Sequence, residues 1–202
     1  MPSLMQEIVA LLAISNPLGA VPVFLAITQG VTTGERTRAA LRAAVAVIVI
    51  LGVVALTGKS VLAVFGISMP ALQAAGGLVV VLMGLEMLHG VPTKVQHDQE
   101  PESAHEQVLV PLAMPLMAGP GAITTVLTLS SRVATWREMA LLLVAVNIVG
   151  AAILVVLLSA DRVGRVMGYR GQRILLRFMG LILAAVGAEI LLAGIYTFVP
   201  QT

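Results

Sequence analysis

The sequence predicts an all-α integral membrane protein with six transmembrane helices, arranged as two inverted three-helix repeats in which spans 1 and 4 are broken. Three observations lead to this fold class. Apolar residues make up 58% of the chain and charged residues only 11%, too few for the surface of a soluble domain. Six segments are long and apolar enough to cross a bilayer. Several motifs recur at a fixed offset of 103 residues, about half of the chain.

The six apolar segments each have the roughly 20 residues that a transmembrane helix needs. The first and fourth contain Pro and Gly, and they qualify only because their interruptions are tolerated. The stretch 61–67 is too short to span, and we expect a turn of interfacial or re-entrant helix there. The predicted spans are residues 4–29, 39–57, 70–88, 108–130, 139–160 and 174–199.

The repeat explains the order of the spans. Each copy holds three of them, an odd number, so the second copy enters the membrane from the opposite face, as in many secondary transporters. The predicted organisation is a first repeat over residues 1–90, a polar cytoplasmic linker over 91–107 and a second, inverted repeat over 108–202. The residues matched by the offset are Pro17 and Pro120, Gly77 and Gly180, Gly84 and Gly187, and Glu86 and Glu189.

Charges outside the spans predict the orientation. Nine basic residues fall on one side of the membrane and three on the other, and the positive-inside rule places the nine in the cytoplasm and both termini outside. The nine are Arg36, Arg38, Arg42, Lys94, Arg162, Arg165, Arg170, Arg173 and Arg177, and the three are Lys59, Arg132 and Arg137.

Spans 1 and 4 carry matching helix breaks. Proline removes a backbone donor, and glycine admits non-helical dihedrals. Inside a membrane such a break survives only where it is buried in protein or lines a watered cavity. The alternative is that both prolines merely kink a helix for packing. Two breaks in register, each with Gly and polar neighbours, favour a binding site instead.

A broken helix offers two kinds of charge. The N-terminus of the second half suits an anion, and the carbonyl groups that end the first half suit an ammonium group or a cation. A zwitterion of amino-acid size meets both demands. The predicted substrate-binding residues are Ser15, Asn16, Pro17, Gly19, Gly119, Pro120, Gly121, Thr124 and Thr125.

Glu86 and Glu189 are the candidates for proton coupling. A carboxyl group within a span is costly, and it therefore suggests a function by default. Glu86 lies near the end of its helix, so a structural role at the lipid headgroups stays open as an alternative. Glu189 lies deeper in its span. Asn147 is predicted to join helices through a hydrogen bond, and Gly84 and Gly187 to permit close helix contact.

Several classes of function are excluded or disfavoured. The chain has no cysteine, so disulfides and thiolate chemistry are impossible. His89, His97 and His105 fit no metal motif, and neither a metal nor a cofactor is predicted. No Ser/His pair or nucleotide-binding loop indicates an enzyme, and a net charge of +2 does not indicate nucleic acid.

Three groups of residues together resemble the MarC family of integral membrane proteins, over nearly the whole chain. The resemblance implies six spans, a bacterial or archaeal cell membrane, and movement of glycine, alanine or similar small amino acids coupled to protons. The family's two broken-helix motifs fall on residues 16–19 and 119–122. The residues that carry the resemblance are Asn16-Pro17-Leu18-Gly19 with Pro22-Val23-Phe24, Ala118-Gly119-Pro120-Gly121-Ala122-Ile123, and Met179-Gly180-Leu181-Ile182-Leu183-Ala184-Ala185.

The leading functional hypothesis is a secondary transporter of small neutral amino acids that alternates access around the two breaks. Its partners would be the amino acid, membrane lipid, and protons or Na+. Two alternatives stay open: an exporter or channel for another small solute, and a membrane scaffold or sensor without flux. The sequence leaves the direction of transport and the oligomeric state open.

Overall fold

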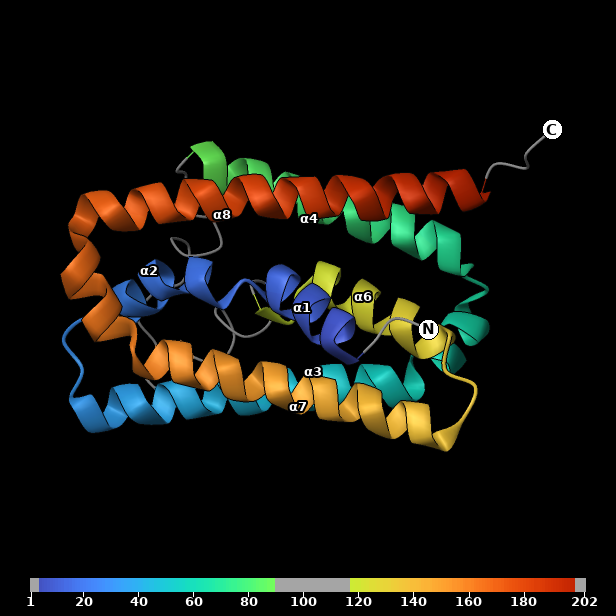
Figure 1. Ribbon diagram of the computed structural model, residues 1–202, viewed down its shortest axis with the longest axis horizontal. Helices are drawn as coiled ribbons and strands as arrows, with labels where there is room; N and C mark the ends of the chain where they lie inside the picture. The colour runs from blue at the N-terminus through green and yellow to red at the C-terminus, as the bar shows by residue number, and fades with distance from the viewer. Residues whose placement is uncertain (1–3, 90–116, 199–202) are drawn as a thin grey trace.

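Helices make up nearly all of residues 4–89 and 117–198, which are the residues that the computed structural model describes (Figure 1). No strand occurs in this part of the chain, so the all-α prediction is confirmed for it. The helices are α1 Leu4–Ser15, α2 Pro17–Ile27, α3 Thr33–Phe65, α4 Met69–His89, α6 Pro120–Ser131, α7 Trp136–Leu158 and α8 Ala160–Phe198.

Five segments of the described chain are long and apolar enough to cross a membrane. The whole predicted linker, 91–107, lies outside the described residues, and the predicted fourth span, 108–130, begins outside them. Its described part, α6, has 12 residues. At 1.5 Å per residue it is ~18 Å long and too short to cross a bilayer alone. The five segments are Leu4–Leu25, Thr33–Phe65, Met69–His89, Trp136–Leu158 and Arg170–Thr197.

Helix α3 extends beyond both predicted ends of the second span. The expectation of a separate turn at 61–67 was wrong, because α3 continues to Phe65 and ends where Gly66 adopts the left-handed conformation with φ 65°. The polar residues near this end lower the hydropathy without breaking the helix. Lys59, for example, turns its ammonium group to the Val133 carbonyl at 3.2 Å.

Helix α8 also begins earlier than predicted. Its first part, from Ala160, is the basic segment that was expected to be a loop between spans. At Gly168 the backbone leaves the helical region, with φ 58° and ψ 180°, and the chain turns sharply into the span that follows (Figure 1). A glycine tolerates this positive φ without steric cost.

Helices α3 and α7 begin with the same local structure, 103 residues apart. Thr32 and Glu35 form a capping box at α3, in which each side chain bonds the backbone of the other. Thr135 and Glu138 form the same box at α7. Such a box satisfies two of the N–H groups that a helix start leaves without partners. The offset found in the sequence therefore also relates two helix starts.

The helices lie in three layers (Figure 1). Helices α4 and α8 lie side by side in one layer, α1, α2 and α6 form the middle, and α3 and α7 form the third. The main apolar core joins the middle layer to α3 and α7, and Leu11, Phe24, Val47, Val126 and Leu142 are among its buried side chains. A smaller core of Val80, Met87 and Leu183 belongs to the α4–α8 layer.

Helices α4 and α8 contact each other through glycines spaced seven residues apart. A Cβ atom added to Gly84 would lie 2.5 Å from the Ala184 nitrogen, and one added to Gly194 would lie 2.5 Å from the Ala74 nitrogen. Both distances are below any that real Cβ atoms adopt, so the helices approach backbone to backbone. The predicted close contacts at Gly84 and Gly187 are confirmed.

The two ends of the bundle differ in charge. The α2–α3 connection and the α7–α8 junction lie at one end, at the left of Figure 1, and the α3–α4 and α6–α7 connections lie at the other. The first end holds eight of the nine basic residues assigned to one side, since the ninth, Lys94, is outside the described residues. An ion pair between Arg36 and Asp161 joins the two connections there.

Candidate functional site

The first break is centred on Asn16, between α1 and α2. Asn16 is buried, with an exposed fraction of 1%, and adopts the left-handed conformation with φ 42°. Its Oδ1 accepts a hydrogen bond from the Gly19 N–H at 3.1 Å, and its Nδ2 donates to Met87 Sδ at 3.8 Å. A Cβ at Gly19 would lie 2.8 Å from Asn16 Cγ, so glycine leaves room for the capping side chain. Asn16 is thus the N-cap of α2.

The cap leaves few donors at the start of α2. Pro17 has no N–H, the Gly19 N–H is bound by Asn16 Oδ1, and the Ala20 N–H donates to the Asn16 carbonyl at 3.2 Å. The sequence predicted an anion site at both breaks. The first break has largely satisfied its own helix N-terminus.

Ser15 ends α1 and is completely buried. Its Oγ has no hydrogen-bond partner within the described part of the chain. The Ala13 carbonyl would normally accept from the N–H four residues later, but that residue is Pro17, which has none. A buried hydroxyl without a partner costs about 1–3 kcal/mol, so this position calls for a ligand or a functional reason.

The second break differs from the first at its cap. Gly119 occupies the N-cap position of α6 in an extended conformation, φ −71° and ψ −177°, and provides no side-chain hydrogen bond. Pro120 follows at the first helical position and is exposed, whereas Gly121 and Ala122 are buried. The N–H groups of Gly121 and Ala122 are those that an N-cap side chain would otherwise bind. Within the described part of the chain, the start of α6 therefore has two buried N–H groups, those of Gly121 and Ala122, that no side chain caps.

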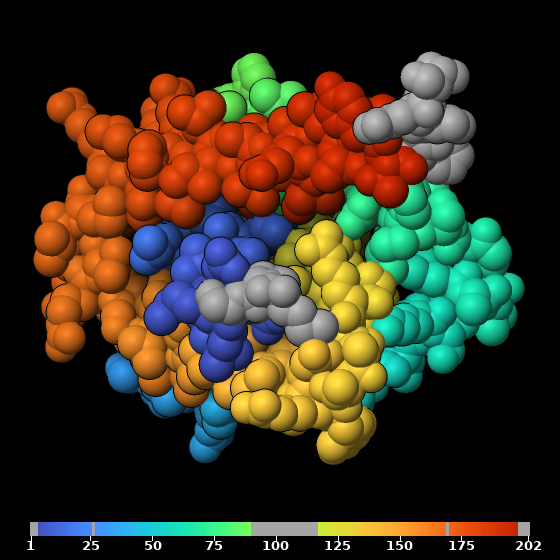
Figure 2. Space-filling model, turned by 45° about the vertical axis from the view of Figure 1, so that its right-hand side comes forward, coloured from blue at the N-terminus to red at the C-terminus, as the bar shows by residue number. Residues whose placement is uncertain are grey.

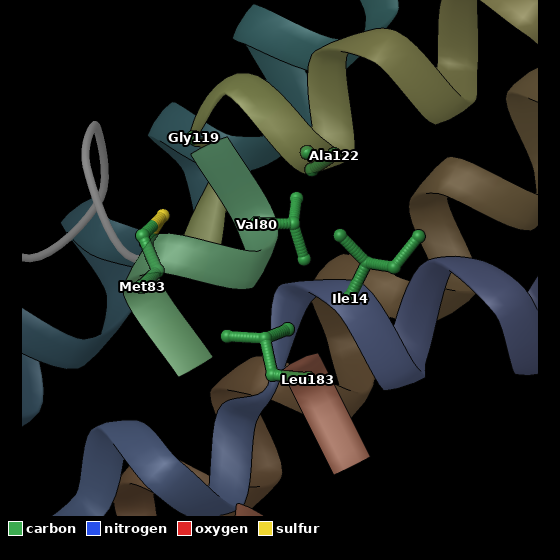
Figure 3. Close-up of a pocket in the computed structure, with 7 residues that line it drawn as sticks. Ile14, Val80, Met83, Gly119, Ala122 and Leu183 are labelled. Carbon is green, nitrogen blue, oxygen red and sulfur yellow. The ribbon is translucent and has the colours of Figure 1, made fainter. Parts of the chain in front are cut away.

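A cavity lies between the two breaks (Figure 3). It is small, with about 10 Å³ of internal space, which is room for about one water molecule, and it is partly open to the exterior. The side chains of Ile14, Val80 and Leu183 point into the same space from α1, α4 and α8, with the start of α6 beside them. The residues that line it are Ile14, Val80, Met83, Gly119, Gly121, Ala122 and Leu183. The structure thus brings the residue before Ser15 next to the uncapped start of α6.

The predicted threonines lie farther along α6 and do not line this cavity. Thr125 Oγ1 donates to the Gly121 carbonyl at 2.9 Å, within its own helix. Thr124 is buried against Gly76 of α4, where no side chain would fit. Sequence analysis missed Gln73, whose Nε2 donates to Thr128 Oγ1 at 3.1 Å across the α4–α6 contact. The available signal was a polar amide inside a predicted span.

The other polar residues singled out within the spans, Glu86, Asn147 and Glu189, face outward. Glu86 and Glu189 are exposed on α4 and α8, away from the breaks, and Glu86 is three residues from the end of α4. Their role in proton coupling stays a prediction. Asn147 is also exposed and donates to the Leu143 carbonyl of its own helix at 2.8 Å. The hydrogen bond to another helix predicted for Asn147 is not seen between the described helices.

Comparison with known proteins gives one consistent result. The chain shares 34% identity over 187 residues with a UPF0056 membrane protein of Pyrococcus abyssi, which covers 93% of this chain and 91% of the relative. It shares 32% over 196 residues with the UPF0056 membrane protein YhcE of Escherichia coli, covering 95% and 91%. It shares 33% over 204 residues with the UPF0056 inner membrane protein MarC of Citrobacter koseri, covering 93% and 91%. No solved structure matched the chain.

The family comparison covers almost the whole sequence. The model of the MarC family of integral membrane proteins matches residues 1–199. With relatives of 32–34% identity along more than nine-tenths of the chain, the match is not confined to one motif. This chain is an integral multi-pass membrane protein and belongs to the MarC family.

Proposed function

We propose that this protein is a secondary transporter of small neutral amino acids such as glycine and alanine, and that it alternates access around its two helix breaks. The observation that carries the proposal is the uncapped N-terminus of α6, which opens on a cavity shared with the end of α1. A buried helix N-terminus with unused N–H groups favours an anionic group such as a carboxylate.

The other half of the zwitterion fits the end of α1. The Ser15 hydroxyl has no hydrogen-bond partner among the described residues, and the Ala13 carbonyl lacks its usual helical donor because residue 17 is proline. Both accept hydrogen bonds, as an ammonium group requires. The walls of the cavity are Gly, Ala and apolar side chains. They support a substrate whose own side chain is small and apolar.

We further propose six spans in two inverted repeats. The matched capping boxes at Thr32 and Thr135 support this arrangement, as do helices that begin at Pro17 and at Pro120. The basic end of the bundle, with eight described Arg residues, supports a cytoplasmic location for that end and extracytoplasmic termini. In such transporters one repeat moves against the other around a site near the midplane.

Uptake into proteoliposomes tests the function. We expect labelled glycine and alanine to accumulate, and Asn16→Leu and Gly119→Leu to abolish uptake. Gly52→Leu is the matched control, since no atom lies within 4 Å of a Cβ at Gly52. Absence of flux and binding for every neutral amino acid would contradict the proposal and favour a scaffold or sensor. Uptake that persists in both break variants would show that the site is elsewhere.

The coupling ion is tested in the same vesicles. Uptake is measured with a pH gradient, with a Na+ gradient and with neither. If protons drive transport through the glutamates, Glu86→Gln or Glu189→Gln should remove the dependence on the pH gradient. A pH dependence that survives in both variants excludes these two residues as the coupling groups.

A further inference from the structure

Helix α8 forms a fixed corner at the basic end of the bundle. Its first part, residues 160–167, continues from the end of α7, and the turn at Gly168 leads into the span beside α4 (Figure 1). Across the turn, Gln172 Nε2 donates to the Gly164 carbonyl at 3.2 Å. A Cβ atom at Gly164 would lie 2.5 Å from Leu25 Cδ1, so the first part also packs closely on α2. Together with the ion pair to α3, these contacts hold the corner in one position.

Arginines and apolar side chains share the outer surface of this corner. Three arginines of the span follow one another at steps of three and four, and three apolar residues that are 57–68% exposed lie on the same face of the helix. The first part of α8 adds two more exposed arginines. Figure 2 shows both parts, in orange, on the outside of the molecule. The five arginines, here called the arginine corner, are Arg162, Arg165, Arg170, Arg173 and Arg177, and the apolar residues are Ile174, Phe178 and Leu181.

The acidic residues described at this end do not neutralise the arginine corner. The Glu35 carboxylate is bound in the capping box of α3, and Asp161 pairs with Arg36, which lies outside the corner. Glu86 of α4 lies about one turn deeper than the last arginine of the corner, at the level of Gly180. Among the described residues, the corner therefore has an excess of positive charge.

The length of the span places these arginines at the membrane surface. Residues Arg170–Thr197 form a helix of 28 residues, which is ~42 Å long and exceeds the ~30 Å of a hydrocarbon core. Thr197 lies twenty residues after Arg177, which already accounts for ~30 Å. The arginines of the span then lie at the depth of the lipid phosphates, and Phe178 lies where the acyl chains begin.

We propose that the arginine corner binds an anionic phospholipid, with its phosphate on the guanidinium groups and an acyl chain along Ile174 and Phe178. A guanidinium group has donors in a planar fork that matches a phosphate. Phosphatidylcholine also has a phosphate, but its choline carries the compensating charge. Charge complementarity therefore favours a lipid with a net negative headgroup. Lipid binding at this corner is independent of the proposed transport.

Lipid-dependent quenching of a single indole tests the site. The chain has one tryptophan, so Trp136→Phe gives a background without one, and Phe178→Trp then places an indole beside the corner. The protein is studied in bilayers that contain brominated phosphatidylglycerol or brominated phosphatidylcholine. We expect phosphatidylglycerol to bind about tenfold more strongly at this indole, and the preference to fall in ~1 M salt. Equal binding of the two lipids would overturn the proposal.

Helix α3 provides a matched control at the same end of the bundle. Leu41 is 50% exposed and stands next to Arg42, as Phe178 stands next to Arg177. The exposed arginines of α3 are only two, Arg38 and Arg42, and no turned segment adds to them. In the Trp136→Phe background, Leu41→Trp should therefore report a preference of at most about threefold. An equal preference at both positions would assign the effect to the basic end as a whole and would overturn a site at the corner.

Removal of arginines tests their role in the Phe178→Trp protein. Arg170→Gln with Arg177→Gln should abolish most of the preference, whereas Arg38→Gln with Arg42→Gln, which removes the same charge, should leave it. Thermal unfolding in phosphatidylcholine confirms that each variant is folded, and the salt dependence of the parent decides if one is not. A preference that survives the first pair of substitutions would overturn the proposal.

A last comparison separates a lipid from a free anion. Because the acyl chain contributes to binding along Ile174 and Phe178, millimolar inorganic phosphate at constant ionic strength should not displace phosphatidylglycerol. If phosphate abolishes the preference, the arginines bind a free anion and the lipid assignment is wrong.

Discussion

Gly84 of α4 and Gly180 of α8 contact each other through their backbones. A Cβ atom on Gly84 would lie 2.7 Å from the Gly180 carbonyl oxygen, and one on Gly180 would lie 2.8 Å from the Gly84 carbonyl oxygen. The offset of 103 residues relates this pair to Gly187 and Gly77, which contact each other in the same way. A Cβ atom on Gly187 would lie 3.0 Å from the Gly77 carbonyl oxygen, and one on Gly77 would lie 2.8 Å from the Gly187 carbonyl oxygen. The two helices run antiparallel, and neither contact has room for a side chain.

Substitution of Gly84 by alanine should therefore destabilise the bundle. The added methyl group meets backbone atoms, which cannot rotate away, so we expect a loss of about 1–3 kcal/mol. Thermal unfolding in detergent or nanodiscs measures it. Gly52→Ala on α3 is the control, because its Cβ meets nothing, and alanine there should be neutral or gain up to about 1 kcal/mol. Equal Tm shifts for the two variants would mean that the α4–α8 contact is looser than described.

Much of this architecture could be predicted from the sequence because the offset marks structural equivalents. It located two prolines that each begin a helix, Pro17 and Pro120, and glycines that each meet a backbone. It did not predict that the breaks differ. Asn16 caps its helix while Gly119 leaves α6 uncapped, and N-cap preference offered a signal for this difference.

The orientation of the glutamates was harder to predict for a physical reason. In a soluble protein apolar residues mark the inner face of a helix, but in a membrane protein both faces are apolar. Nothing in the pattern around Glu86 or Glu189 therefore distinguishes the bundle interior from lipid. Helix boundaries failed for a related reason, since hydropathy marks where a helix leaves the bilayer and not where it ends. Helix α3 thus continues past Lys59.

Arg36 joins three elements at the basic end of the bundle. Its Nη2 donates to the Thr28 carbonyl at 2.8 Å, its Nε donates to Thr28 Oγ1 at 3.2 Å, and Asp161 completes the contacts. Thr28 is fully buried, so Arg36→Ala leaves its carbonyl without this donor and should lower the free energy of unfolding by about 1–3 kcal/mol. Asp161 is 43% exposed, so Asp161→Ala should cost only about 0–1 kcal/mol, and less in high salt.

Unfolding of these variants at low and high salt measures the difference. Arg38→Ala is the matched control, since Arg38 is exposed on the same helix and the variant loses the same charge. A larger loss of unfolding free energy in Asp161→Ala than in Arg36→Ala would contradict this prediction. It would show that the ion pair, and not the hydrogen bond to the Thr28 carbonyl, holds this end of the bundle together.

The uncapped start of α6 leads to a prediction about substrate affinity. Gly119 has an extended backbone that any residue adopts, and serine is among the best N-cap residues. Gly119→Ser should place a hydroxyl on the N–H groups of α6, stabilise the fold by only a few tenths of a kcal/mol and compete with a substrate carboxylate. Gly119→Ala adds nearly the same volume without the acceptor. We expect the KM for uptake to be higher in the Gly119→Ser variant than in the Gly119→Ala variant. Equal KM values in the two variants would show that the substrate carboxylate does not bind at this helix end.

Substitutions at Ser15 distinguish a role in substrate binding from a role in packing. If its buried hydroxyl only fills space, Ser15→Ala removes a polar group without a partner, and both stability and uptake should stay the same or improve. If the hydroxyl binds the ammonium group of the substrate, the variant should be at least as stable by thermal unfolding yet transport with a clearly raised KM. Ser15→Thr, which keeps the hydroxyl, should then recover part of the affinity. Because stability and affinity move in opposite directions only when the hydroxyl binds substrate, measuring both in the same preparation decides between the two roles. An unchanged KM in the Ser15→Ala variant would show that the Ser15 hydroxyl does not bind the substrate.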